Sequence, residues 1–247
     1  MKGVWKLTFV EMKLFFREPM AAFFTLAFPL MMLLLFGGIY GNKPNYLLGG
    51  MGYIDTAIPA LIALIIATSS MLTLPIQIAT YRENKILRRL RATPLRPHAI
   101  IIAQVVNIFL MTTAGMVLLG IAGKLIFNAT FPTHVVDMTL AYLFSCLTFF
   151  ILGFVLASVF TSPRVAMSVA MAIFYPMIFL SGATIPFEIL PYAIRPYSRA
   201  LPLTQVVMLL RGVWRGEAFS AQIGPIIYLL IMFILGLFLT SRIFRWE

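Results

Sequence analysis

The side chains best suited to specific recognition are concentrated in one short stretch of the sequence, YRENKILRRLRATPLRP at residues 81–97. This stretch holds six of the chain's 19 lysines and arginines. Thr80 and Glu83 have the spacing of a capping box, which predicts a short helix beginning at Thr80, and Pro94 and Pro97 would end it. Thr80 also fits an inner turn of a longer helix that arrives from the preceding apolar run. We call residues 81–97 the basic segment.

An apolar ridge follows the predicted helix of the basic segment, with basic side chains beside it. The ridge is Ile86, Leu87 and Leu90, and the flanking side chains are Lys85, Arg88, Arg89 and Arg91. Such a helix suits an anionic lipid surface, at about 1 kcal/mol for each basic residue near it. It equally suits a groove of a cytosolic partner that would bury the ridge. These residues alone do not decide between the two partners.

A second group of polar side chains recurs at helical spacing inside long apolar runs. Its members are Ser70, Thr73 and Gln77 in one run, and Gln104, Asn107 and Met111 in the next. Polar side chains inside membrane-spanning helices commonly form hydrogen bonds between helices. The alternative is that they line a path for a transported molecule. Gly153 and Ala157 in a later run have the small-xxx-small spacing of close helix packing.

Several kinds of chemistry have no matching residues in the sequence. His98 and His134 have no cysteine or carboxylate nearby at metal-ligand spacing, and GGIYGNK at 37–43 lacks the spacing of a phosphate-binding loop. The long apolar runs contain no charged residue, whereas ion-coupled pumps place ionisable groups at membrane depth. Neither a catalytic cluster nor a pore ring is evident. The sequence therefore predicts no metal, no cofactor and no source of energy of its own.

The elements that position these residues follow from composition. The 247 residues are 61% hydrophobic and only 11% charged, and the mean hydropathy is +0.97. Six windows without Asp, Glu, Lys or Arg cover residues 19–42, 56–81, 97–123, 138–163, 165–187 and 218–241. Each is long enough to cross a hydrocarbon core as a helix, which takes about 20 residues. We predict an all-α integral membrane protein in which residues 1–247 form one domain with six transmembrane helices.

The net charge of +11 reports topology rather than nucleic-acid binding. If both termini are cytoplasmic, thirteen of the 19 basic residues lie on the inner side and six on the outer side. The positive-inside rule selects this orientation. We expect a multi-pass plasma (inner) membrane protein with both termini and the basic segment in the cytoplasm, and no nucleic-acid partner.

Two segments flank or interrupt the spans. Residues 1–18 predict an amphipathic helix in the inner membrane interface, with its basic stripe toward lipid phosphates. Glu11 and Glu18 share the opposite side, where they either lie at headgroup level or latch onto a neighbouring helix. Residues 185–217, between spans five and six, are too broken by proline for a span. Arg211 and Arg215 would share a face there and bind lipid headgroups.

Two motifs resemble those of the permease subunits of ABC transporters of the ABC-2 class. The basic segment is similar to the family's loop between spans two and three, which reads R-E, a short gap, then L-x-R-L-R-x-T-P. The matching positions are Arg82, Glu83, Leu87, Arg89, Leu90, Arg91, Thr93 and Pro94. Residues 179–212 are similar to the family's F-L-S-G, Pro, L-P and L-P-L-T pattern with a later Arg. Asn84 and Lys85 stand where many members have a glycine-containing step.

The resemblance implies a permease without a nucleotide site, and so no enzyme. Two such subunits, identical or different, would form the translocation path, and cytosolic subunits that bind ATP would power it. Residues 80–97 would be the coupling helix docked on the ATPase, with Leu87 and Leu90 as anchors and Glu83 paired with an arginine of the ATPase. A basic rim would surround the anchors, formed by residues that include Arg82, Arg89 and Arg91. Residues 185–217 would dip into the membrane as re-entrant outer helices.

The character of the spans suggests a cargo. They offer neutral hydrogen-bonding groups together with many Phe and Met side chains, which form adaptable apolar surfaces. We therefore expect export of an amphipathic, drug-like or lipid-like molecule. Export of a lipid-linked glycan or polysaccharide is the alternative within the same family, and a membrane-embedded enzyme or a channel is the alternative of another class.

Overall fold

The computed structural model describes residues 2–44, 50–85, 97–160, 162–184, 187 and 190–243. Across these residues the secondary structure is helical, apart from one isolated bridge between Pro44 and Gly52. The helices are α1 (Lys2–Arg17), α2 (Pro19–Ala22), α3 (Phe28–Tyr40), α4 (Tyr53–Thr68), α5 (Leu74–Glu83), α7 (Pro97–Phe127), α8 (Val135–Val159), α9 (Pro163–Leu180), α10 (Arg195–Arg199), α11 (Pro202–Trp214) and α12 (Ile223–Ile243). Two π-helical stretches, η1 (Phe23–Ala27) and η3 (Ser69–Thr73), and a short 3₁₀ turn, η5 (Phe219–Ala221), complete them.

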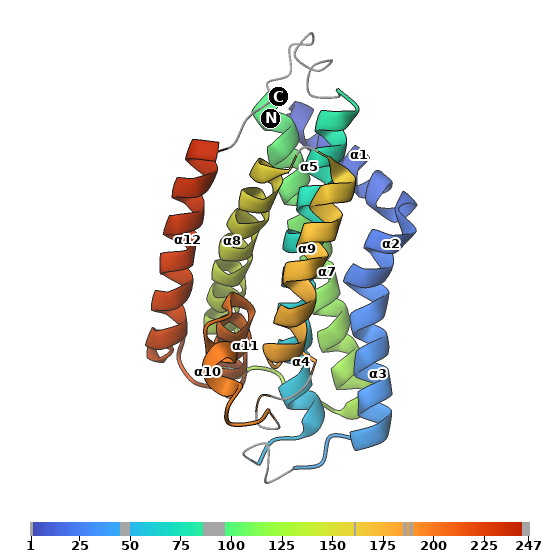
Figure 1. Cartoon of the computed structure of the whole chain (residues 1–247). Coiled ribbons are helices and arrows are strands. Elements are labelled where there is room, and N and C mark those ends of the chain that lie inside the picture. Colours follow the sequence, from blue (N-terminus) through green and yellow to red (C-terminus); the bar gives the residue numbers. More distant parts are fainter. Residues whose placement is uncertain are drawn as a thin grey trace.

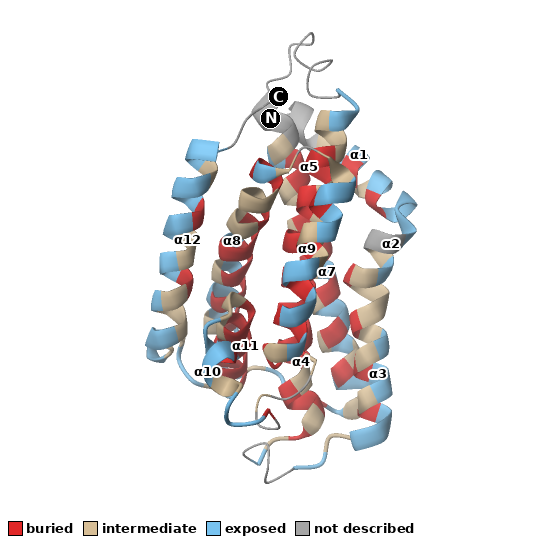
Figure 2. Ribbon diagram, in the orientation of Figure 1, coloured by how far each residue is buried: buried red, intermediate tan, exposed pale blue. Residues whose placement is uncertain are grey.

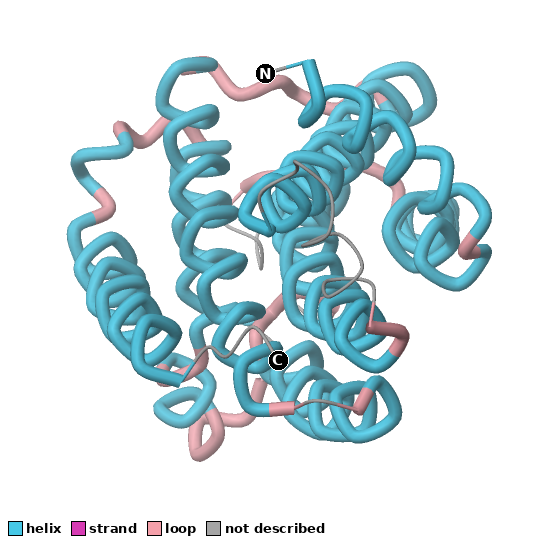
Figure 3. The backbone as a smooth tube through the Cα atoms, turned by 90° about the horizontal axis from the view of Figure 1, so that it is seen from above, coloured by secondary structure: helices cyan, strands magenta, loops and turns pink. Residues whose placement is uncertain are grey.

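Six helical stretches within the described ranges are long and apolar enough to cross a membrane. They are Phe23–Tyr40, Tyr53–Glu83, Ile101–Phe127, Val135–Val159, Pro163–Leu180 and Ile223–Ile243. The prediction of an all-α chain with six spans is therefore confirmed. The long helices run side by side as one bundle (Figure 1), and their packing is seen end-on in Figure 3. The start of α1 and the end of α12 lie at the same end of this bundle (Figure 1).

The second span is the central element of the bundle. It runs without a break through α4, η3 and α5 over 31 residues, and 83% of its most apolar window is buried. For the sixth span, α12, the corresponding share is only 11%, which Figure 2 shows as a largely exposed helix. At 1.5 Å per residue the second span is about 45 Å long, which exceeds a ~30 Å hydrocarbon core. At least one of its ends therefore projects beyond the apolar part of a bilayer.

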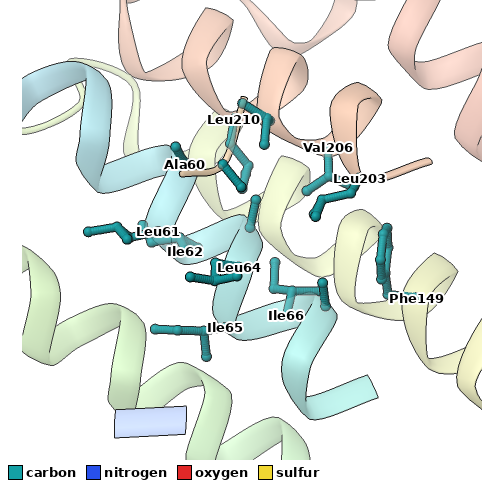
Figure 4. Close-up of a cluster of buried hydrophobic side chains, with 14 of the residues drawn as sticks. Ala60, Leu61, Ile62, Leu64, Ile65, Ile66, Phe149, Leu203, Val206 and Leu210 are labelled. Atoms are coloured by element: carbon teal, nitrogen blue, oxygen red, sulfur yellow. The ribbon is translucent and has the colours of Figure 1, made fainter. Parts of the chain in front are cut away.

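The hydrophobic core surrounds this span. Leu61, Ile62, Leu64, Ile65 and Ile66 of α4 are each 4% exposed or less. Figure 4 shows side chains from α8 and α11 in the same cluster: Phe149, Leu203, Val206 and Leu210. The core thus joins the second span to the fourth span and to the short helix α11.

The fourth span approaches the second span at backbone distance. A Cβ placed on Gly153 would overlap the carbonyl oxygen of Ser70 in η3, so only glycine allows this approach. Ala157, one turn further along α8, is also fully buried. The small-xxx-small pair therefore serves helix packing, as its spacing predicted. The π-helical turn of η3 lies at this contact, and such turns are often found at functional sites.

The segment between spans five and six forms short helices, as the family resemblance implied, and no span, as its prolines predicted. α10 has five residues and α11 has 13, so neither can cross a bilayer. α11 lies at the end of the bundle opposite the chain termini (Figure 1) and buries ten residues against its neighbours. The Ser198 hydroxyl of α10 donates to the carbonyl of Leu180 at the end of α9. The depth of this segment in a bilayer, and the division of residues 1–247 into segments at 1–18, 80–97 and 185–217, stay predictions.

Candidate functional site

The end of α5 and the start of α7, which flank the basic segment in the sequence, lie at the end of the bundle that also carries the start of α1 and the end of α12 (Figure 1). The chain leaves α5 at Glu83 and enters α7 at Pro97. Four of the predicted coupling residues lie outside the described residues: Leu87, Arg89, Leu90 and Arg91. The structure therefore describes how the segment is held at its two ends.

The predicted helix start at Thr80 is wrong, whereas the predicted stop at Pro94 lies outside the described residues. Thr80 is not a cap, because α5 continues through it to Glu83 and its hydroxyl donates to the carbonyl of Ile76 four residues earlier, at 2.8 Å. Proline at position 97 begins a helix instead of ending one, since its fixed φ suits the first helical turn. The alternative that Thr80 belongs to a long second span is confirmed.

The second span ends on a residue in a left-handed conformation. Lys85 has φ of 54°, and its backbone N–H donates to the carbonyl of Arg82 at 3.0 Å. Helices commonly end this way, usually on glycine, because other L-residues are strained there. Lys85 therefore occupies a position where glycine would be less strained. The exposed Glu83 side chain lies just before this turn.

Arg82 holds the end of the second span to the fourth span. Its Nη1 donates to the carbonyl oxygen of Ala157 at 2.6 Å, near the C-terminus of α8. Carbonyls in the last turn of a helix lack partners within the helix, and they carry its negative dipole end, which a cation stabilises. Arg82, predicted as part of the rim that faces the ATPase, therefore also has a structural role inside the permease.

The N-terminal helix α1 is latched to the same end of the second span. Tyr81 donates its hydroxyl to Glu11 Oε1 at 2.6 Å, and Gln77 Nε2 lies 3.5 Å from Glu18 Oε2. Phe15 is 2% exposed between these contacts. The latch alternative is confirmed for Glu11, which is 7% exposed. The depth of Glu11 in a bilayer stays a prediction.

The environment of Glu11 makes this latch sensitive to pH. Burial raises the pKa of Glu11 above its ordinary value; the hydrogen bond from Tyr81 opposes this shift, and the charge of Glu18 adds to it. A raised pKa means that the docked state favours the protonated carboxyl group. Protonated Glu11 therefore stabilises the docked position of α1. This contribution is fully present below the ordinary pKa of 4.5 and is lost as the pH rises through the raised pKa.

The residues proposed to line a path divide into two groups. Ser70 is fully buried, and its hydroxyl donates to the carbonyl of Ile66 in its own helix at 2.6 Å. Gln77 takes part in the contact with Glu18, and Thr73 is half-buried at the end of η3. Of these three side chains, only Gln77 is linked by a hydrogen bond to another part of the described bundle, through its Nε2, while its Oε1 has no partner there.

On the third span the two amides behave differently. Gln104 and Asn107 are 1% and 0% exposed, yet neither the oxygen nor the nitrogen of either amide has a hydrogen-bond partner in the described structure. Met111, one turn further along α7, is 6% exposed. An unsatisfied buried polar group costs about 1–3 kcal/mol. The structure thus leaves both amides free to form further hydrogen bonds, and their place in a substrate path stays a prediction.

Arg211 is a functional residue that the sequence analysis placed wrongly. It does not face lipid headgroups with Arg215, because it is only 8% exposed whereas Arg215 is exposed. Its Nε donates to the carbonyl of Thr56 at 3.2 Å and its Nη2 to the carbonyl of Gly182 at 3.1 Å. It therefore ties α11 to the far end of the second span and to the turn after α9. The available signal was its position as the only charge among residues 200–214.

The described residues contain no group of three His, Cys, Asp or Glu side chains that could hold a metal ion. Residues 3–214 match the family model of the ABC-2 type transporter. The chain therefore belongs to this family, whose members are transmembrane transport subunits that work with an ABC subunit that binds ATP. No curated protein shows a significant match to the chain.

The latch between α1 and the second span makes a direct prediction. Tyr81→Phe removes the hydroxyl that donates to Glu11. The buried carboxylate then lacks this hydrogen bond, at a cost of about 1–3 kcal/mol. Hydrogen–deuterium exchange at neutral pH should therefore become faster in residues 7–17. Glu11→Gln keeps an acceptor and removes the charge, so its exchange should be as slow as in the wild type or slower. Tyr197→Phe, at a position 75% exposed, is the control. Wild-type exchange in Tyr81→Phe would show that the latch does not hold α1.

Proposed function

We propose that this chain is the permease subunit of an ATP-driven exporter in the plasma membrane. It would pair with a second permease, identical or different, and with a separate subunit that binds ATP, so that the permease itself needs no cofactor. The observation that carries this proposal is the second span. One end of it leads into the basic segment, and Arg211 binds the other end to α11 and the outer turn.

The proposed orientation puts both termini and the basic segment in the cytoplasm. The excess of basic residues on that side supports it, as does the shared position of the start of α1 and the end of α12 (Figure 1). In a Cys146→Ala chain, a cysteine at Tyr192, which is 84% exposed, should react in intact cells with an impermeant thiol reagent. A cysteine at the exposed Glu83 should react only after the membrane is permeabilised. Reaction at position 83 in intact cells would reverse the orientation.

The basic segment would be the contact through which the ATPase moves the permease. Leu87 and Leu90 are the proposed anchors, and Arg89 and Arg91 belong to the basic rim at the membrane. Because Arg82 and the α1 latch fix the end of α5, a displacement of the segment would move the second span as a rigid body. The exposed Glu83 is free of the latch and is the candidate for pairing with an arginine of the ATPase.

A single substitution tests this contact. Leu90→Glu would place an unpaired charge in the docking groove, at a cost of several kcal/mol. The variant should reach the membrane at normal levels, because position 90 lies outside the six uncharged windows of the sequence. We expect co-purification of the ATPase and transport to fall together, while Leu90→Met, which conserves volume, should retain both. Normal co-purification with normal transport in Leu90→Glu would remove the basic segment as the main coupling contact.

The cargo would pass close to Gln104, Asn107 and Met111. Two neutral amides beside apolar side chains suit an amphipathic drug-like or lipid-like molecule, which can accept and donate hydrogen bonds without carrying a fixed charge. The polar residues of the second span would contribute to this path only if the span moves. They are Ser70, Thr73 and Gln77, and the Ser70 hydroxyl and Gln77 Nε2 are already bonded inside the bundle. A lipid-linked glycan is the alternative cargo in the same path.

The two unsatisfied amides allow function and stability to be separated. Asn107→Ala removes no hydrogen bond that the described structure contains, so its melting temperature should equal or exceed that of the wild type. In the reconstituted complex it should change which amphipathic compounds stimulate ATP hydrolysis. Ser168→Ala, at an exposed serine of α9, is the control and should change neither property. A large loss of stability in Asn107→Ala would show a structural role. Stimulation of the wild type by a lipid-linked glycan alone would favour the glycan cargo.

A further inference from the structure

A groove separate from the proposed path lies between the third and fourth spans. It has a volume of about 400 Å³, within the range of ~300–1,000 Å³ typical of ligand sites. Its most buried residues are Ile62, Met138, Tyr142 and Trp214. Its rim is apolar and exposed, and includes Val117, Ile121, Phe131 and Leu143. We call this the α7–α8 groove.

The groove follows the helices and opens to the surroundings of the bundle. Its lining residues on α7 extend from Phe109 to Ile121, a length of about 18 Å at 1.5 Å per residue. This is close to the thickness of one leaflet, half of a ~30 Å hydrocarbon core. Because α7 and α8 are membrane-spanning helices, the medium next to the rim is lipid. The shape and the medium both fit an acyl chain that lies parallel to the helices.

One polar group in the groove lacks a partner. Thr113 donates to the carbonyl of Phe109 at 2.7 Å, so in its 2.9 Å contact with Tyr142 the tyrosine hydroxyl is the donor and both groups are satisfied. Trp214 is 7% exposed, and its Nε1 has no acceptor in the described structure. An indole N–H is a donor only. Because this nitrogen is covered by its neighbours, the lining that an occupant meets is almost entirely apolar, as an acyl chain requires.

Basic residues lie at one end of the groove. The positions of α7 that line it recur every three or four residues and end with Gly120 and Ile121, and the same helical face continues to the exposed Lys124. The position of a Cβ on Gly216 lies 3.6 Å from Thr133 Oγ1, so its two chain neighbours of opposite charge, Arg215 and Glu217, both come near the lining loop. Lys124 is therefore the basic residue that decides the charge at this end of the groove. Asp137 falls on the opposite side of α8 from the lining positions, by helical spacing. The end of the groove is therefore suited to a phosphate.

We propose that the α7–α8 groove binds one acyl chain of an anionic phospholipid, with the phosphate at Lys124. The groove is lined by the second, third and fourth spans and by α11, so an acyl chain there would contact four of the elements that export would move. The lipid acts as a resident ligand and differs from the exported cargo, and the proposal does not depend on the proposed function.

The test uses the purified wild-type chain in lipid nanodiscs without ATP. The probe is phosphatidylglycerol with a diazirine in its acyl chain, and phosphatidylcholine with the same chain is compared with it. Labelling from phosphatidylglycerol should concentrate in residues 109–121 and 131–143 and exceed that of α12, the most exposed span. Labelling spread over all spans in proportion to their exposure would overturn the proposal, because it describes ordinary surrounding lipid.

Two variants with matched controls test the apolar and the charged parts. A Cβ on Gly120 would meet Phe131 at 3.6 Å, an ordinary contact, so Gly120→Leu can fill the groove and should reduce its labelling about tenfold, equivalent to ~1.4 kcal/mol. Gly38→Leu, in open space on α3, should leave the labelling of the groove unchanged.

Lys124→Gln tests the charged part. It should reduce the preference for phosphatidylglycerol about fivefold, as expected for ~1 kcal/mol per basic residue, and Lys43→Gln should leave this preference unchanged. Unchanged labelling in Gly120→Leu, or an unchanged preference in Lys124→Gln, would contradict the proposal.

Discussion

Hydrogen bonds inside a membrane cannot be exchanged for bonds to water, and this constraint determines how the second span is held. A bilayer core satisfies no polar group, so polar side chains near this span must find partners within the bundle. Glu11 accepts from Tyr81 at one end, and Arg211 donates to Thr56 near the other. The apolar contacts shown in Figure 4 fill the length between these two points. The span is thus fixed at both ends and buried in the middle.

This arrangement makes the second span a rigid link between the two ends of the bundle. The elements fixed to it are α1 and the end of α8 near the basic segment, and α11 with the turn after α9 at the far end. Packed helices shift as units between discrete arrangements. A push on the basic segment would therefore reach the outer helices without a change in the individual helices. The unpaired amides of Gln104 and Asn107 lie beside this link, where a moving helix can open or close a polar path.

The fold was predictable because it follows from properties that sequence carries directly. Long windows without charged residues predict the spans. The prolines of residues 185–217 predict that this segment, which contains α10 and α11, is not a span. The basic segment could also be recognised from the sequence, by its apolar ridge at Leu87 and Leu90 and by its resemblance to the ABC-2 family. Its bounds were not predictable, because a capping box at Thr80 and an inner helical turn have the same local residues. The choice between them depends on the long second span as a whole.

The partners of individual side chains were harder to predict than the elements. Arg211 and Arg215 lie four residues apart at the end of α11, a spacing that predicts one shared face. Only Arg211 points into the bundle, where the carbonyls of Thr56 and Gly182 accept its hydrogen bonds. Those carbonyls are far from it in sequence. The sequence left two roles open for Glu11, a latch onto a neighbouring helix or a carboxylate at headgroup level. The hydrogen bond from Tyr81, 70 residues away in the chain, supports the latch. Contacts of this kind depend on three-dimensional packing, which the order of residues does not show.

The central claim is that Arg211 transmits movement of the second span to the outer segment. The most direct measurement is the distance between spin labels at Ile39 and Tyr192, both exposed, in a Cys146→Ala permease bound to its ATPase. ATP should shift this distance in the otherwise unchanged chain. In Arg211→Lys, which keeps the charge but lacks the planar guanidinium that reaches two carbonyls, the ATPase should still bind but the shift should disappear. An equal shift in both chains would contradict the account.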